Sequence, residues 1–444
     1  MPSIELTRAW VQFLVPVGQI RLGRMPSHWG LGILVTGGGS ASPLVNGQTA
    51  GAITDPPVGE WGDTLIGTTS DRILFATRPL TVYNALTRQD ARPTPLILGI
   101  AYDKLVEDRL AYPPGVEEGP IGDPPPPSFR RESGSPFSFL AAGADDVQQT
   151  IGLAVWNDPD FNARNAAADE LSVGLYYVNR TQEATASDVH IFDGYWRLRW
   201  SPSPTMPSLY TAGEVLNIRG RSRGLVLAGG CGSRTNPVAL CNEMKADIWG
   251  AVARLGAIDR QDRWAATVEW GHSSGDPDYF GGELTARPLH PDYRVGLLMY
   301  PVVMAVRTST LGEPLRPLWS RGGVWNSSYL YSQLRYQIIP GIQVHGAFLV
   351  AWADELLGTI YVNQRDDAST ECGMFQGDCG LGWEADLALR VRWGENDVMR
   401  WDTELGLMGA GPALYADDAA ARATVGGLSE PLLWTIQTRA AMVW

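Results

Sequence analysis

Arginines and carboxylates recur at every second position in several segments of the chain, most clearly in 381–393 and 397–410. Such a row of charges can line a water-filled passage that attracts and passes anionic or polyhydroxy solutes. It can equally form cross-strand ion pairs that keep an interior polar and do nothing more. Both interpretations stay open for any single pair. The residues that share this inward parity are Arg8, Arg21, Arg197, Arg199, Arg335, Arg390, Arg392, Arg400, Arg439, Asp193, Glu269, Glu384, Asp386, Asp402 and Glu404.

A catalytic function would rest on one compact group, His272-Ser273-Ser274 with Asp276. A catalytic triad is recognised by geometry rather than by adjacency in sequence, so this signal is weak. The sequence contains no GxxxxGK[ST], GxGxxG or HExxH motif. We therefore predict a protein that is not an enzyme and that needs no cofactor.

The four cysteines form two local pairs, Cys231/Cys241 and Cys372/Cys379, among Gly, Asn, Asp and Thr residues. A zinc site would need tighter Cys spacing or a nearby His, and neither pair has them. Two short-range pairs in loops indicate disulfides formed in an oxidising compartment. We therefore expect two disulfides and no metal site.

The elements that must position these side chains are β-strands, because apolar and polar residues alternate with a period of two. In 381–393, for example, Trp383, Leu387 and Trp393 alternate with charged residues. Fifteen candidate strands follow the same pattern. They cover 4–14, 17–25 (with an extension to 36 left open), 70–79, 95–104, 147–156, 170–180, 187–200, 209–220, 244–257, 261–273, 325–338, 341–352, 381–393, 397–410 and 431–444.

The connections between these strands alternate between short and long. Short turns such as Val15-Pro16 and Ile339-Pro340-Gly341 take turns with long connections rich in Gly and Pro. The long ones cover 37–69, 105–146, 221–243, 274–324, 353–380 and 411–430. A soluble β-sandwich has no reason to place its long loops at one end, whereas transmembrane β-barrels have short periplasmic turns and long external loops.

The last segment, 431–444, alternates in the same way, and its apolar face carries Trp434 near one end and Trp444 at the other. A tilted strand of about ten residues crosses a lipid band of this height. An aromatic terminal strand resembles the carboxy-terminal signal of bacterial outer-membrane β-barrels, which the barrel-assembly machinery recognises during insertion. Trp434 and Trp444 are our candidates for that signal.

The strand count predicts a barrel of about sixteen strands. Both ends of such a barrel normally lie in the periplasm, yet the first connection here is a short turn. We therefore expect one further strand before residue 4, and a signal peptide, to belong to the natural protein. An additional strand within Tyr293–Val306 would instead raise the count towards eighteen.

Composition agrees with a membrane barrel and excludes other classes of protein. No run of about 20 apolar residues exists, which excludes a transmembrane helix. The net charge of -13 argues against nucleic-acid binding. The 17 Trp and 15 Tyr residues are amphipathic aromatics of the kind that gather at membrane interfaces, so the expected partner is outer-membrane lipid.

Several segments also resemble one known family. Arg21-Leu22-Gly23-Arg24-Met25-Pro26-Ser27-His28-Trp29-Gly30 is similar to an early strand of the alginate-export type of porin, although Met25 stands where that group usually has Gln. The stretch 268–276, the 292–294 turn and the terminal strand resemble the same broad group. The resemblance implies an outer-membrane barrel with a polar, Arg-bearing lumen, and it does not imply alginate as the solute.

We therefore predict that 1–444 is a single all-β domain, an antiparallel transmembrane β-barrel in the bacterial outer membrane. The predicted function is passive passage of small hydrophilic solutes, anionic ones among the candidates, through the lumen. The alternative is a barrel whose lumen is closed by the loops 37–69, 105–146 or 274–324 and which serves as a structural or surface-interaction scaffold. The sequence indicates no oligomeric state.

Overall fold

The structure is a computed structural model that describes most of the strands and part of the connections. The described residues are 8–37, 61, 67–87, 93–105, 147–159, 161, 169–182, 186–203, 205–222, 244–277, 282–309, 320–356, 372, 379–394, 398–415 and 428–442.

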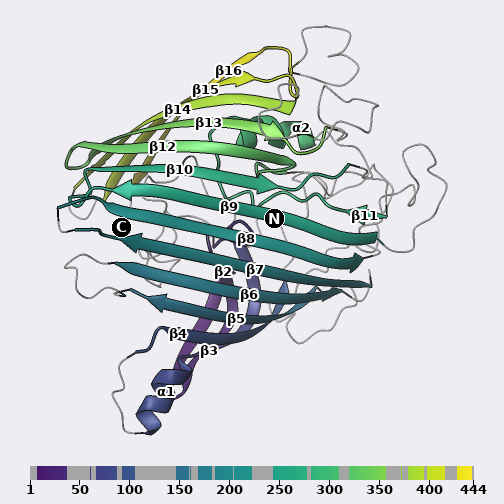
Figure 1. Cartoon of the computed structure of the whole chain (residues 1–444), viewed down its shortest axis with the longest axis vertical. Coiled ribbons are helices and arrows are strands. Elements are labelled where there is room, and N and C mark those ends of the chain that lie inside the picture. The colour runs from purple at the N-terminus through teal and green to yellow at the C-terminus, as the bar shows by residue number, and fades with distance from the viewer. Residues whose placement is uncertain are drawn as a thin grey trace, which may run out of the picture.

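Among the described residues, sixteen strands form one sheet (Figure 1). Fifteen of them form a continuous antiparallel wall, and the short β11 (Glu283–Leu284) pairs in parallel with β9. The wall strands are β1 (Ala9–Val15), β2 (Gly18–Ser27), β3 (Thr68–Thr77), β4 (Leu96–Leu105), β5 (Gln148–Asp158), β6 (Glu170–Gln182), β7 (Ser187–Trp200), β8 (Ser208–Ser222), β9 (Met244–Ile258), β10 (Trp264–Ser273), β12 (Ser327–Ile339), β13 (Ile342–Ala353), β14 (Gly380–Trp393), β15 (Met399–Ala410) and β16 (Leu432–Met442).

The wall confirms the strand pattern expected from the alternation, because each of the fifteen candidate segments overlaps one wall strand. Neighbouring strands are antiparallel throughout, so β1 and β16, at the two edges, run in the same direction. The strand expected before residue 4 lies outside the described residues and stays a prediction.

The convex face of the wall is apolar. Along β14, Trp383, Leu387, Leu389 and Trp393 are exposed, while the residues between them point to the other face and are mostly buried. The same alternation continues on the other long strands, for example in Leu175 of β6 and Leu255 of β9, each about two-thirds exposed. An apolar surface of this extent is rarely exposed to water, so the convex face contacts membrane lipid.

Exposed aromatic residues form two bands on this convex face, one near each end of the strands. Trp383 and Trp393 mark the two bands on β14, ten residues apart. At about 3.3 Å per residue and a tilt of about 40°, this spacing corresponds to roughly 25 Å across a membrane. The band towards the long connections contains Tyr102, Tyr177, Trp249, Trp383 and Trp434, and the other contains Trp156, Trp200, Tyr336, Trp393 and Trp401. These bands define a transmembrane β-barrel wall.

The two ends of the wall differ as the loop lengths predict, with two exceptions. The helix α1 (Pro79–Leu86) joins β3 to β4 on the short-turn side and was missed; the Pro at its first turn was the available signal. On the opposite side, only residues 183–186 separate β6 from β7. Among the described residues, no helix is both long enough and apolar enough to cross a membrane.

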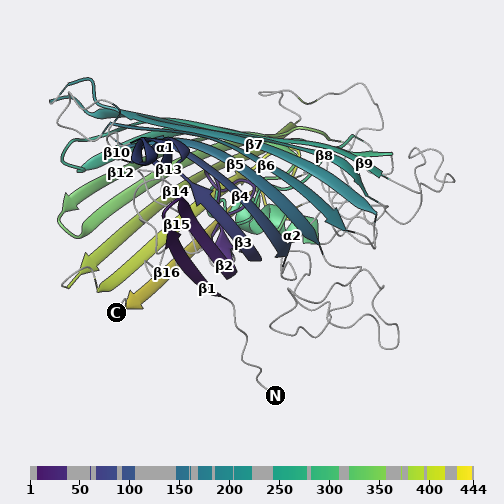
Figure 2. The same cartoon turned by 90° about the horizontal axis from the view of Figure 1, so that it is seen from below.

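The predicted additional strand in Tyr293–Val306 is wrong. This segment contains the π-helical turn η3 (Met299–Met304) and the start of the short helix α2 (Ala305–Ser309). Met299, Tyr300 and Met304 are fully buried, and α2 lies on the concave side of the curved wall (Figure 2). The helical turns satisfy their backbone hydrogen bonds locally, so the segment can pack against the wall without a strand partner.

The cysteine predictions have a divided outcome. Cys372 and Cys379 form the expected disulfide in the connection between β13 and β14, and Cys379 is fully buried. Cys231 and Cys241 lie outside the described residues, so their pairing stays a prediction.

Candidate functional site

The concave face of the wall is the candidate site, and two segments of chain fold onto it. The first follows β2, where Trp29, Leu31 and Ile33 are buried. The second runs from Glu283 through η3 and α2, with residues 320–326 returning to β12. Both contact inward side chains of the wall, as the following interactions show.

Glu384 of β14 binds the second segment through its backbone. Its carboxylate accepts hydrogen bonds from the N–H groups of Leu297 (2.5 Å), Leu298 (2.7 Å) and Met299 (2.7 Å). Gly296, immediately before them, has φ +72°, and a Cβ there would lie 2.8 Å from the Glu384 carboxylate. Only glycine allows this approach. Glu384 therefore fixes the loop in place, which was not part of its predicted lumen role.

Glu214 of β8 repeats this arrangement with the first segment. Its carboxylate accepts hydrogen bonds from the N–H of Leu31 and from that of Gly32 at 3.0 Å. Gly30 has φ +54°, and a Cβ at this position would collide with the same carboxylate. Two loops are therefore fixed to the wall by the same device: a carboxylate on a strand and backbone amides after a left-handed glycine.

Asp193 of β7 lies beside this first contact. It is buried, and its Oδ1 accepts a hydrogen bond from Trp29 Nε1 at 3.1 Å. The Trp29 ring stacks on Tyr176 at 4.7 Å and meets the edge of Tyr195 at 5.0 Å. Asp193 therefore has the predicted inward direction, and its partner is a loop side chain.

Glu269 of β10 is buried in a network with a second loop residue. Arg254 Nε donates to Glu269, and Arg254 Nη2 donates to Tyr293 Oη at 2.7 Å. Tyr329 Oη also donates to Glu269, at 2.5 Å. Glu269 is therefore inward as predicted, and its charge is neutralised by a buried arginine rather than exposed to a solute.

The last three strands carry the charged row predicted from the sequence. Asp402 faces Arg390 on one side and Arg439 on the other in the strand register, and it accepts a hydrogen bond from Arg439 Nη2 at 2.8 Å. Glu404 accepts hydrogen bonds from Arg390 Nη2 at 3.2 Å and from Gln437 Nε2 at 2.6 Å. This part of the inner face is polar, and hydrogen bonds and ion pairs connect its neighbouring strands.

Two arginines face each other near the short-turn end of these strands. Arg392 and Arg400 lie directly opposite each other in the register, so two like charges meet on the inner face. Arg390 also lies 6.0 Å from the ring of Trp61, which belongs to the connection after β2. Asp386, buried beside Glu384, lies further towards the long loops.

Arg197 is the least satisfied of the predicted arginines. It is 9% exposed and its guanidinium lies 5.6 Å from the centre of the Tyr210 ring. Its Nε and Nη1 have no hydrogen-bond partner among the described residues, and neither does Nε of its neighbour Arg199. Buried donors of this kind need water or an anion.

The remaining predicted arginines have identified partners. Arg335 of β12 forms an ion pair with Asp262 in the turn before β10. Arg21 Nε donates to Gln12 at 3.1 Å, and Arg8 Nη2 donates to the carbonyl of Gly37 at 2.6 Å. Arg8 therefore fixes the start of β1 to the first inward segment.

His290 connects three parts of the interior. Its backbone N–H donates to the carbonyl of Ile33 (2.8 Å), its ring Nε2 lies 3.0 Å from Thr68 Oγ1, and its ring Nδ1 accepts the backbone N–H of Asp292 (3.1 Å). Burial, together with the nearby charges of Arg287 and His28, lowers the pKa of His290 to about 3. Burial also lowers the pKa of His28. His290 is therefore neutral at ordinary pH.

The group weighed for catalysis has structural contacts. His272 Nδ1 lies 3.0 Å from Ser328 Oγ, whereas Ser273 Oγ donates to the carbonyl of Arg287 at 2.8 Å. Ser274 Oγ donates to the carbonyl of Thr285. The segment 271–275 has G-x-S-x-G spacing, but it extends from β10 and lacks the strand-to-helix turn of a nucleophile elbow.

Sequence reasoning missed Glu214, Arg254, Arg72 and Asp103. Arg72 Nε and Nη2 each donate to Asp103 at 2.6 Å on the inner face of β3 and β4. All four lie in segments that were expected to be strands. Parity alone would have found Glu214, the single carboxylate in 209–220.

Known proteins resemble this chain only in their structures. Neither a protein-family model nor a curated protein matches the chain. Solved structures do resemble it at low identity. Pseudomonas aeruginosa OccK11 (OpdR) has a TM-score of 0.43, with 10% identity, over 96% of this chain and 78% of its own. OccK5 (OpdH) of the same organism has a TM-score of 0.43 and 8% identity, over 98% of this chain and 80% of its own. The outer membrane protein opdK, also from Pseudomonas aeruginosa, has a TM-score of 0.40 and 10% identity, over 89% of this chain and 73% of its own.

At this level of similarity the neighbours carry no information about solute or lumen. The location follows from the wall itself. Antiparallel strands with an apolar convex face, two aromatic bands and asymmetric loops form the architecture of bacterial outer-membrane proteins. The protein is therefore an all-β barrel-wall protein of the bacterial outer membrane. The alginate-export resemblance has no support from these comparisons.

Proposed function

We propose that the protein is an outer-membrane channel that passes small hydrophilic solutes and favours anions. The observation that carries this proposal is Arg197, a nearly buried inward guanidinium with unpartnered Nε and Nη1 atoms among the described residues. The opposed pair Arg392 and Arg400 adds positive charge on the same face. A solute with a carboxylate or phosphate would supply the acceptors that these donors need.

The two inward segments would set the width and selectivity of this passage. Glu214 and Glu384 hold them against the wall by charge-assisted hydrogen bonds, so they form a fixed constriction rather than a loose lid. Both carboxylates bind backbone amides of the inward segments, and Arg254 neutralises Glu269. Arg197, whose Nε and Nη1 have no hydrogen-bond partner among the described residues, is the arginine best placed to interact with a solute.

A second candidate function has an observation of its own. The inward segments bury Tyr300, Val324 and Trp325 completely, as a plug would. If they close the lumen, the barrel serves as a structural or surface-interaction scaffold. Single-channel recording in a planar bilayer separates the two candidates, and an absence of openings over many insertions would favour the scaffold.

Reversal potential in a salt gradient tests the anion preference. Arg197→Gln should shift it towards cations, and joint neutralisation of Arg390, Arg392 and Arg400 should shift it further. Arg263→Gln is the matched control, because Arg263 lies in a turn and is 62% exposed. An unchanged potential in both lumen variants would contradict the anion proposal. Each variant is first checked for the mobility difference between boiled and unboiled samples in SDS gels.

A further inference from the structure

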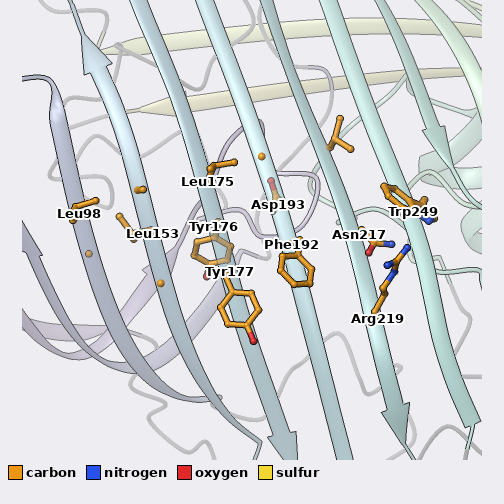
Figure 3. Close-up of a pocket in the computed structure, with 15 residues that line it drawn as sticks. Leu98, Leu153, Leu175, Tyr176, Tyr177, Phe192, Asp193, Asn217, Arg219 and Trp249 are labelled. Atoms are coloured by element: carbon orange, nitrogen blue, oxygen red, sulfur yellow. The ribbon is translucent and has the colours of Figure 1, made fainter.

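The convex face of the wall contains a groove across β4 to β9 (Figure 3). It has a volume of about 860 Å³. Its apolar sides are formed by exposed residues, among them Leu98, Leu175, Phe192 and Trp249. Asp193 and Tyr176 also border it, but their side chains contact Trp29 on the concave face. The groove therefore opens towards lipid and is separate from the lumen.

The groove exists because two wall positions lack side chains. A Cβ at Gly152 would meet no atom within 4 Å, and one at Gly194 would meet only Leu175 at 3.5 Å and a backbone oxygen at 3.8 Å. Around them, large side chains cover the convex face. Membrane lipid must fill such a depression, since an empty apolar groove would lose the contacts that its sides could make.

One end of the groove is polar and lies towards the long connections. Arg219 and Asn217 of β8 form it together with Trp249. Arg219 Nε lies 3.2 Å from Asp247 Oδ1, and its guanidinium lies 5.8 Å from the centre of the Trp249 ring. The side chain is 58% exposed, and its two Nη groups form no hydrogen bond that the structure describes. Two donors are therefore free to bind a headgroup.

The charges around this end are mixed. Arg221 and Lys245 are adjacent in the register and exposed, next to Arg219. Asp247 is the carboxylate closest to Arg219, and Asp188 lies on the next strand, where its Oδ1 is 3.6 Å from His190 Nε2. Glu283 lies beside Lys245. Arg219 is the cation that borders the groove itself.

We propose that this groove binds one membrane lipid with an anionic phosphate headgroup. An acyl chain would lie over Gly152 and Gly194, between Leu175 and Phe192. The phosphate would accept hydrogen bonds from the Nη groups of Arg219, at the height of the aromatic band that contains Tyr177 and Trp249. Arginine is well suited to this role because its fork-shaped guanidinium matches phosphate geometry.

The test is lipid retention by the detergent-purified full chain, measured by native mass spectrometry with phosphatidylglycerol and phosphatidylcholine as probes. We expect one retained phosphatidylglycerol and a preference over phosphatidylcholine. Gly152→Leu should fill the groove and lower phosphatidylglycerol affinity about tenfold, equivalent to roughly 1.4 kcal/mol. Arg219→Gln should remove the preference while leaving acyl-chain binding in place.

Gly346→Leu is the matched control. Gly346 lies on the convex face of β13, and a Cβ there also meets nothing within 4 Å, but it does not line the groove. The Gly346→Leu variant should bind phosphatidylglycerol with the same affinity as the unchanged protein. Equal phosphatidylglycerol binding by the unchanged protein, Gly152→Leu and Gly346→Leu would overturn the proposed site. An unchanged headgroup preference in Arg219→Gln would overturn the role of Arg219. Gel mobility of unboiled samples verifies that each variant is folded.

Discussion

The inner faces of two sectors of the wall differ, although their outer faces are alike. In the β8–β9 sector the inward residues are mainly apolar, such as Leu216, Ile248 and Val252, and they are buried. In the β15–β16 sector they include Asp402, Glu404 and Arg439, in a polar network. The inward loops cover the first sector, whereas in the second the Arg439 side chain remains 40% exposed. What covers a face decides its chemistry, even where the strand period is the same.

The largest expected loss of stability comes from a substitution in the covered β8–β9 sector. Arg254→Met leaves the buried Glu269 without its cation and frees Tyr293 of the second inward segment. Loss of one partner of a buried ion pair should lower the free energy of unfolding by about 3–5 kcal/mol. Urea unfolding in lipid vesicles, followed by tryptophan fluorescence, measures this loss.

The double variant Arg254→Met with Glu269→Gln is the informative control, because it removes both charges. It should recover a large part of the lost stability. If Arg254→Met alone changes stability no more than the exposed Arg263→Gln does, then the interior of this sector is not closed as described.

Acidification should weaken the covered sector through His290. Its pKa is about 3 in the folded protein and has an ordinary value near 6.5 when the loop is released. The released form therefore takes up the proton more readily, so loop docking is strongest above pH 6.5 and weakens as pH falls towards 3. A proton on Nδ1 would also oppose the Asp292 N–H.

Protease sensitivity of the inward segment at pH 7, 5 and 4 measures this release. His290→Gln should reduce the pH dependence, with the remainder due to His28. Equal pH dependence in the two proteins would exclude His290 as its source.

The smallest expected effect on stability lies in the polar sector. Asp402→Asn removes an ion pair whose Arg439 side chain is 40% exposed, so the free energy of unfolding should change by less than about 1 kcal/mol. The reversal potential should still move towards anions, because a lumen carboxylate is lost. A stability loss as large as that of Arg254→Met would show that the two sectors are equally closed.

Much of the candidate site could be predicted because parity in a strand fixes direction. The inward direction of Asp193, Glu269, Glu384 and Asp402 was obtained from alternation alone. Their partners were not, because Trp29, Tyr293 and Leu297 lie in connections that carry no period. Glu384 was expected to face a solute and instead binds three backbone amides.

The sequence by itself determined the wall: where strands lie, which face meets lipid, and which end has long loops. These follow from a period of two and from local turn residues, so each segment carries its own signal. Only the tertiary structure decided that the segments after β2 and around η3 return to the concave face. That choice depends on contacts between residues far apart in sequence, such as Gly30 with Glu214 and Gly296 with Glu384, and no local pattern encodes them.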